Sequence, residues 1–130
     1  MTPDGTWSWS EAQYEHKAFQ YWAPKQVLAI PQSTYEYSNN YYRYLSELVL
    51  VNVDPATGLS VKGRIDHSAY YNANPQNYWQ YIDIRRAIFM GDFVYAISDK
   101  AVTVHRLSDL AKTAEQVLPG YTPGDYYWWW

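Results

Sequence analysis

Short apolar runs separated by turn residues restrict most strongly how this 130-residue chain folds. The stretch "RRAIFMGDFVYAISDKAVTVHRLSDL" at 85–110 runs apolar, turns at Gly91-Asp92, runs apolar again, turns at Asp99-Lys100 and then alternates. Runs of about four to eight β-branched and aromatic residues between Gly and Asp turns are typical of antiparallel strands. The stretch therefore predicts three strands joined by two hairpin turns.

The same pattern predicts eight strands in two groups. The first group covers 17–22, 26–30, 47–53 and 60–65, and the second covers 86–90, 93–98, 101–107 and 113–118. The string "DPATG" at 54–58 predicts a hairpin loop, because Asp54 can accept hydrogen bonds from backbone N–H groups ahead of it and Gly58 tolerates a positive φ. A helix over 107–118 competes with the last strand, since apolar residues there also fall near helical spacing.

The two groups of strands can be overlaid on each other. Ala29-Ile30 matches Ala96-Ile97, and "LVLVNVD" at 48–54 matches "VTVHRLS" at 102–108. A repeated antiparallel unit of roughly 40–50 residues with four strands is the blade of a β-propeller. The predicted fold class is therefore all-β, with antiparallel four-stranded β-propeller-type blades in about two copies, a partial propeller. A single eight-stranded sandwich or barrel built from hairpins is the alternative.

The pattern also predicts the domain organisation, a single β domain over 1–130. A blade-like unit at 14–66 with a Tyr-rich insertion at 34–46 is followed by a linker at 67–83, a second blade-like unit at 84–120 and an aromatic tail at 121–130. A repeat buries its faces only against its neighbours, so two blades leave apolar faces open. We expect self-association, or the missing blades of a longer chain, to cover these faces.

Aromatic residues are far more frequent than in ordinary globular proteins. Fifteen Tyr, seven Trp and three Phe make up 19% of the chain. Tyr and Trp combine an apolar body with a polar tip, which suits ligand-binding and protein-binding loops. We therefore expect contacts with a glycan or protein ligand, or with a partner, at Tyr41, Tyr42, Tyr70, Tyr71, Tyr78, Trp79, Trp128, Trp129 and Trp130. The alternative is that these rings only cover exposed sheet faces.

Several function classes are not expected from this composition. The net charge is −3 with scattered basic residues, which argues against a nucleic-acid partner, and no apolar run approaches the roughly 20 residues of a membrane span. There are no cysteines, and His16, His67 and His105 lack metal-site spacing. No G-x-S-x-G nucleophile motif is present. We therefore expect no metal, no cofactor, no catalytic site and no enzyme activity.

Three strings together resemble a known family. They are "SEAQYEHKAFQYW" at 10–22, "VLAIP" at 27–31 and "IRRAIFMGDFVYAISDKAVTVHRLSDL" at 84–110. In this order they resemble the C-terminal β-propeller domain, distantly related to WD40 repeats, of a family of bacterial and archaeal secreted proteins. The resemblance covers about 8–118 and corresponds to the last two blades of that domain.

The resemblance implies a non-catalytic scaffold or binding module of unknown ligand. It also implies an extracellular or cell-surface location, although "MTPDGTWSWSEAQ" at 1–13 has neither the basic nor the apolar region of a signal peptide. Family members run to several hundred residues, so further blades are expected upstream in a longer protein or from other copies of this chain. Two alternatives stay open: a glycan-binding module that uses Tyr and Trp loops, and a fragment of a larger propeller enzyme whose active site is not in this chain.

Overall fold

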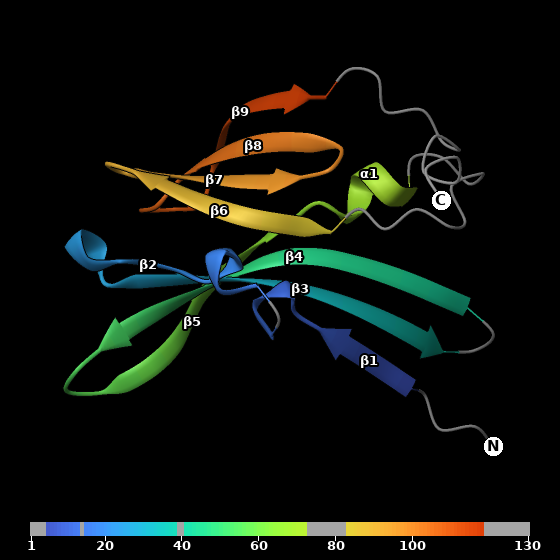
Figure 1. Ribbon diagram of the computed structural model, residues 1–130, viewed down its shortest axis with the longest axis horizontal. Helices are drawn as coiled ribbons and strands as arrows, with labels where there is room; N and C mark the ends of the chain where they lie inside the picture. The colour runs from blue at the N-terminus through green and yellow to red at the C-terminus, as the bar shows by residue number, and fades with distance from the viewer. Residues whose placement is uncertain (1–4, 14, 39–40, 73–82, 119–130) are drawn as a thin grey trace.

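The computed structural model describes residues 5–13, 15–38, 41–72 and 83–118, which form two antiparallel sheets (Figure 1). The first sheet contains β1 (Gly5–Trp9), β2 (Gln20–Trp22), β3 (Val27–Ser38), β4 (Tyr41–Asp54) and β5 (Gly58–Asp66). The second contains β6 (Ile84–Met90), β7 (Phe93–Ser98), β8 (Ala101–Arg106) and β9 (Lys112–Val117). The short helix α1 (Ser68–Asn72) lies between them in the chain, and the 3-10 turns η1 (Glu11–Gln13), η2 (His16–Ala18) and η3 (Ala23–Lys25) precede β3. The all-β fold class, with antiparallel propeller-type blades, is confirmed.

Each sheet is four strands wide. The second sheet is a meander in the order β6-β7-β8-β9, and the first has the order β1-β3-β4-β5 with β2 also paired to β3. The strands β1 and β2 share one edge of β3: Trp22 pairs with Val27 near the start of β3, whereas Trp9 pairs with Ser33 farther along. Two short strands therefore take the place of one edge strand.

The predicted hairpin loop at 54–58 is confirmed in detail. One carboxylate oxygen of Asp54 accepts hydrogen bonds from the backbone N–H of Ala56 at 2.7 Å and of Thr57 at 3.3 Å. These bonds lower the pKa of Asp54. Gly58 has a φ of 96°, a conformation that residues with a Cβ rarely adopt.

Several strand boundaries differ from those predicted. Within 34–46, which was expected as an insertion, residues 34–38 continue β3 and residues 41–46 belong to β4, so the two strands pair over a long stretch. Their Tyr-rich alternation suits a strand, and β1 pairs with the extension of β3. The strand expected at 17–22 starts only at Gln20, since residues 16–18 form the 3-10 turn η2. The competing helix over 107–118 is wrong, because 107–109 form a turn and β9 follows.

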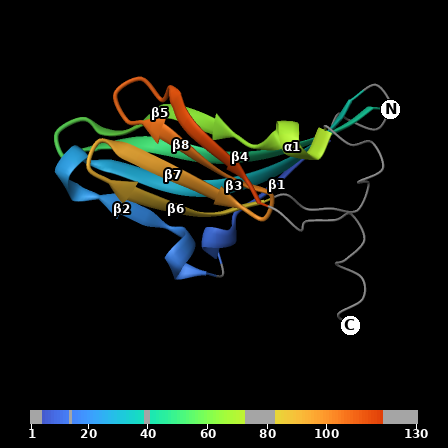
Figure 2. The ribbon, with the colours of Figure 1, turned by 90° about the horizontal axis from the view of Figure 1, so that it is seen from above.

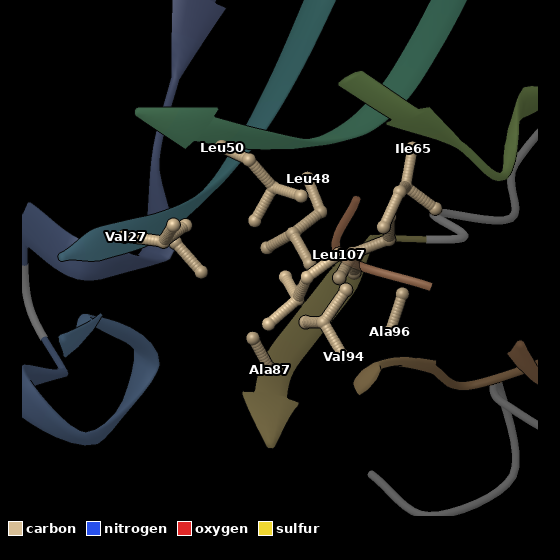
Figure 3. Packing of buried hydrophobic residues seen from close by; sticks show 10 residues of the cluster. Val27, Leu48, Leu50, Ile65, Ala87, Val94, Ala96 and Leu107 are labelled. Atoms are coloured by element: carbon tan, nitrogen blue, oxygen red, sulfur yellow. The ribbon is translucent and has the colours of Figure 1, made fainter. Parts of the chain in front are cut away.

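The hydrophobic core lies between the two sheets (Figure 3). The first sheet contributes Val27, Ala29, Leu48, Leu50 and Ile65, and the second contributes Ile84, Ala87, Val94, Ala96 and Leu107 from the turn after β8. Alanines on the second sheet leave room for the leucines of the first, so the two faces interlock. Figure 2 shows the second sheet lying across the first.

The two sheets are closest at β6. Its backbone contacts β2, β3 and β4, while β9 lies on the far side of the second sheet (Figure 1). At this inner edge Trp22 stacks on Phe89 with ring centroids 6.0 Å apart, and the indole N–H of Trp22 donates a hydrogen bond to the carbonyl oxygen of Gly91 at 3.2 Å. The arrangement is that of two neighbouring propeller blades joined near their inner strands.

Candidate partner interfaces

The second sheet turns an apolar face away from the core. Strand alternation puts one set of side chains opposite the buried set, and the register places Ile88 beside Tyr95 and Tyr95 beside Val104. We call this the second-sheet outer face; it comprises Ile88, Met90, Phe93, Tyr95, Ile97, Val102 and Val104. Met90 is 55% exposed and Ile88 is 42% exposed. These side chains form one contiguous apolar surface on the side away from the first sheet.

The first sheet has a matching surface on its own far side. We call it the first-sheet outer face; it comprises Leu28, Ile30, Val49, Val51, Val53, Leu59 and Val61. Leu59 is 70% exposed and Val61 is 60% exposed, whereas Leu28 and Val49 are buried. Antiparallel sheets with one face in water usually alternate apolar and polar side chains. Both sheets here are apolar on both faces, which is the pattern of sheets that are covered on both sides.

A buried polar network fastens the second sheet to the end of β5. The imidazole of His67 is fully buried, and its Nδ1 and Nε2 lie 2.9 Å from the Ser98 hydroxyl and 2.7 Å from the Thr103 hydroxyl. The Thr103 hydroxyl also lies 3.0 Å from Nε2 of His105, whose Nδ1 contacts the Leu110 carbonyl oxygen at 3.0 Å. This series of hydrogen bonds thus joins the segment after β5 to β7, to β8 and to the turn before β9.

The same network is buried and uncharged. Burial and, to a smaller extent, the neighbouring His105 lower the pKa of His67 to about 4, so the ring is neutral at ordinary pH. Ser98 is only 2% exposed and its hydroxyl donates a hydrogen bond to the carbonyl oxygen of Ala101. The hydroxyl is therefore engaged and shielded from any substrate. Ser68, the sequence neighbour of His67, instead accepts a hydrogen bond from the backbone N–H of Ser46 at 2.9 Å.

An aromatic cluster lies on the long β3–β4 hairpin, and it was not predicted. Trp9, Tyr35 and Tyr44 have ring centroids 5.1 to 6.2 Å apart. The Tyr44 hydroxyl donates a short hydrogen bond to the Asp83 carboxylate, and the Ser33 hydroxyl donates another at 2.5 Å. Burial, followed by the charge of Asp83, raises the pKa of Tyr44. The alternation in "GTWSW" at 5–9 was the sequence signal that would have indicated β1.

Of the predicted contact residues, the structure places the side chain of Tyr70 alone. Tyr70 lies in α1 with its ring edge-on to His67 at a centroid distance of 5.3 Å. Burial and a hydrogen bond with Glu115 raise its pKa to about 12. Tyr70 thus contributes to internal packing. Tyr41 and Tyr42 belong to β4 and Tyr71 to α1, with side chains outside the description, while Tyr78, Trp79, Trp128, Trp129 and Trp130 lie outside the described residues.

A cleft of about 390 Å³ opens where the turns of the two sheets meet. Its charged lining residues are Lys25, Lys62, Asp92 and Arg106. Lys25 forms an ion pair with Asp92 at 3.0 Å, and Arg106 pairs with Asp109 at 3.1 Å. Most of the charge is therefore balanced within the chain.

The described ranges contain neither a metal-ligand cluster nor a membrane-spanning helix. In those ranges, no three His, Cys, Asp or Glu residues lie close enough together to hold a metal ion. No helix in the same part of the chain is long and apolar enough to cross a bilayer.

Comparison with known proteins agrees with this architecture. A sequence family described as the beta propeller domain matches residues 2–110, which include the first sheet and the second sheet as far as the turn after β8. No curated protein matched the chain, and no solved structure did so either. Because the family match spans most of the sequence, this chain belongs to the beta propeller domain family.

Proposed function

We propose that this chain is a non-catalytic scaffold and binding module, a pair of propeller blades whose two outer faces pack against further blades. The observation that carries the proposal is the apolar character of both outer faces, with Leu59 and Val61 on one side and Ile88 and Met90 on the other. Soluble proteins rarely leave such contiguous apolar surfaces in water. A module of this kind supplies shape and rigid surface rather than reacting groups.

The proposal includes an extracellular or cell-surface location and a distant kinship with WD40 repeats. Both rest on the sequence resemblance. The view that the chain is not an enzyme is supported by the burial of His67 and Ser98, whose imidazole Nδ1 and hydroxyl lie 2.9 Å apart. If a longer parent protein has an active site, the proposal puts that site on other blades.

A glycan-binding role is the weaker candidate. It rests on Tyr41, Tyr42, Tyr71, Tyr78 and Trp79, whose side chains the structure does not describe. Tyr70 already packs on His67 and bonds Glu115, so it has little ring surface to offer a sugar. Binding of the chain to a polysaccharide array would favour this role over that of a scaffold.

The scaffold proposal is tested by asking whether the outer faces are covered. The full chain is compared with a Val61→Lys/Ile88→Lys double variant by light scattering and by fluorescence of an apolar dye such as anilinonaphthalene sulfonate. Substitutions at exposed turn positions, Ala56→Lys and Ser108→Lys, add the same charge away from the faces and serve as the control.

Two results would support the proposal: an assembly that leaves no dye-binding surface, or a monomer that binds the dye through Val61 and Ile88. The double variant then loses the assembly or the dye signal, and the control variant keeps it. A wild-type monomer that binds no dye and is unaffected by the lysines would show that the faces are ordinary solvent-exposed surface and would overturn the proposal.

A further inference from the structure

We propose that the first-sheet outer face of one copy of this chain packs on the second-sheet outer face of another copy, so that chains assemble head to tail into a closed ring. The inference rests on the proposed scaffold function and names the partner of its open faces. Each outer face is thus covered by a second copy of this chain. The first-sheet outer face is covered by the second-sheet outer face of that copy, and the reverse holds for the other face.

The packing inside the chain provides the template for this contact. Within one copy, a face of the first sheet already packs on a face of the second, with Leu48 and Leu50 set against Ala87 and Ala96. The two outer faces are the remaining faces of the same two sheets. Their centres are aliphatic, with the neighbouring pair Val51 and Val61 on the first sheet, so they can interlock in the same way.

The placement of the two faces allows a head-to-tail contact to repeat from copy to copy. They lie on opposite sides of the stacked pair, as the ribbon shows (Figure 1), so a single contact cannot cover both. Each unlike-face contact leaves one face of each kind open in the assembly. These open faces bind further copies, or each other once the rotation closes the ring. The two sheets meet at β6 and not at β9, so successive pairs splay around a common centre. Propellers have about four to eight blades, which corresponds to about two to four copies of this chain.

Charge favours the contact of unlike faces over that of like faces. The polar end of the first-sheet outer face carries two acidic residues, Glu47 and Asp66, and one basic residue, Arg64. Arg64 forms an ion pair with Glu47 at 2.9 Å, so the negative charge of Asp66 is left over. The second-sheet outer face carries Arg86 and Arg106, the latter paired with Asp109. Two second-sheet faces in contact would bring arginines together, whereas the unlike pairing sets an acidic surface beside a basic one.

Complementary single variants test the arrangement. Val61→Glu blocks the first-sheet outer face, and Ile88→Lys blocks the second-sheet outer face. We expect the wild-type chain to form one discrete oligomer in sedimentation velocity and light scattering, and each variant to run as a monomer. An equal mixture of the two variants still contains one intact face of each kind, so it should form a 1:1 dimer that grows no further.

Controls separate assembly from folding. Ala56→Glu and Ser108→Lys should leave the oligomer intact, and circular dichroism should show that Val61→Glu and Ile88→Lys keep the wild-type strand content. If either variant does not fold, Leu59→Glu and Met90→Lys replace them, because these positions are the most exposed on each face.

The outcomes also separate this inference from the scaffold proposal. A wild-type monomer that binds the apolar dye would overturn self-assembly while leaving the scaffold proposal standing. A dimer of Val61→Glu alone would show contact between like faces and would overturn the head-to-tail arrangement. A monomer without dye binding would overturn both.

Discussion

Leu110 lies directly over Gly63, so close that a Cβ added to Gly63 would come within 2.3 Å of the Leu110 Cδ1 atom. Gly63 belongs to β5 in the first sheet, and Leu110 follows β8 in the second, in a backbone conformation with a φ of 58°. Leu110 also packs against the core between the sheets. The pair therefore joins the sheets away from β6, where the absence of a side chain on one strand makes room for a turn of the other sheet.

This contact predicts that Gly63→Ala destabilises the protein. The added methyl group must displace Leu110, and overpacking of this kind typically costs about 1–3 kcal/mol. Urea unfolding followed by circular dichroism measures the loss. Leu110→Ala should remove most of the clash, so the double variant should be less destabilised than the two single effects together. Strict additivity would show that the two residues do not interact.

The buried His67 predicts a loss of stability on mild acidification. Its folded-state pKa is lowered to about 4, below the ordinary value of 6.5, so the folded protein favours the neutral ring. Above pH 6.5 the ring is neutral in both states, and stability is at its full value. Between pH 6.5 and about 4 the imidazole is protonated in the unfolded chain but stays neutral in the folded chain. The free energy of unfolding therefore falls by at most roughly 3 kcal/mol.

The free energy of unfolding measured in urea from pH 7.5 to 4.5 checks this expectation. His67→Gln should be less stable at pH 7.5 but should lose less with acid, because the group that titrates is gone. His105 has a pKa lowered by burial too, so a smaller slope should remain in that variant. An unchanged slope in His67→Gln would assign the acid sensitivity to other groups.

Two leucines of the first sheet should differ strongly in how much their replacement by alanine lowers the free energy of unfolding. Leu48 is fully buried between the sheets and Leu59 is 70% exposed on the first-sheet outer face. Leu48→Ala should cost about 2–5 kcal/mol through the lost burial and the cavity left behind. Leu59→Ala should change the stability of the monomer by less than about 0.5 kcal/mol. Thermal or urea unfolding of both variants at low concentration gives the comparison, and equal effects would contradict the placement of the core.

Tyr44 predicts a hydroxyl-dependent contribution to stability. Its ring is buried, and its hydroxyl donates to Asp83, which also accepts from Ser33. Tyr44→Phe keeps the ring but removes one donor from a charged acceptor, and such hydrogen bonds contribute about 1.5–3 kcal/mol. Tyr21→Phe, at a position 47% exposed, is the control and should be close to neutral. A neutral Tyr44→Phe would mean that water replaces the hydroxyl at no cost.

The strands of the second sheet were predictable because their signals are local. Gly91 supplies a positive φ at the first tight turn, and the apolar runs beside it match β6, β7 and β8 closely. Asp54 and Gly58 fixed the β4–β5 hairpin in the same way. Turn chemistry and alternation act over a few residues, so a single sequence reveals them.

The overlay of the two groups of strands shows where local reasoning stops. It equates Ala29 with Ala96, yet both point into the core between the sheets. Blades related by rotation present opposite faces to their shared interface, so true equivalents could not both lie there. A shift of one residue reverses every side chain of a strand, so this part of the overlay is out of register by an odd number of residues. The match of 48–54 with 102–108 keeps the expected register, because Leu48 points into the core and Val102 points away from it.

The polar network and the aromatic cluster were beyond prediction for a different reason. His67 meets Ser98 and Thr103 across more than thirty residues of sequence, and Tyr44 meets Asp83 across thirty-nine. Such contacts depend on how the sheets are placed, which no local pattern encodes. The expected contact residues were chosen by residue type, and Tyr70 proved to be a packing residue of that network.

Because β1 and β2 share one edge of β3, the two halves of that edge are paired by different strands and can lose their pairing separately. Its first half, beside the core, is hydrogen-bonded to β2, and its second half, with the Trp9 cluster, is hydrogen-bonded to β1. A proteolytic cut in the turns between these strands would let β1 detach and bare the backbone of the distal half, while Val27 and Ala29 stay paired. The hairpin tip can thus open its edge to an incoming strand without disturbing the joint between the blades.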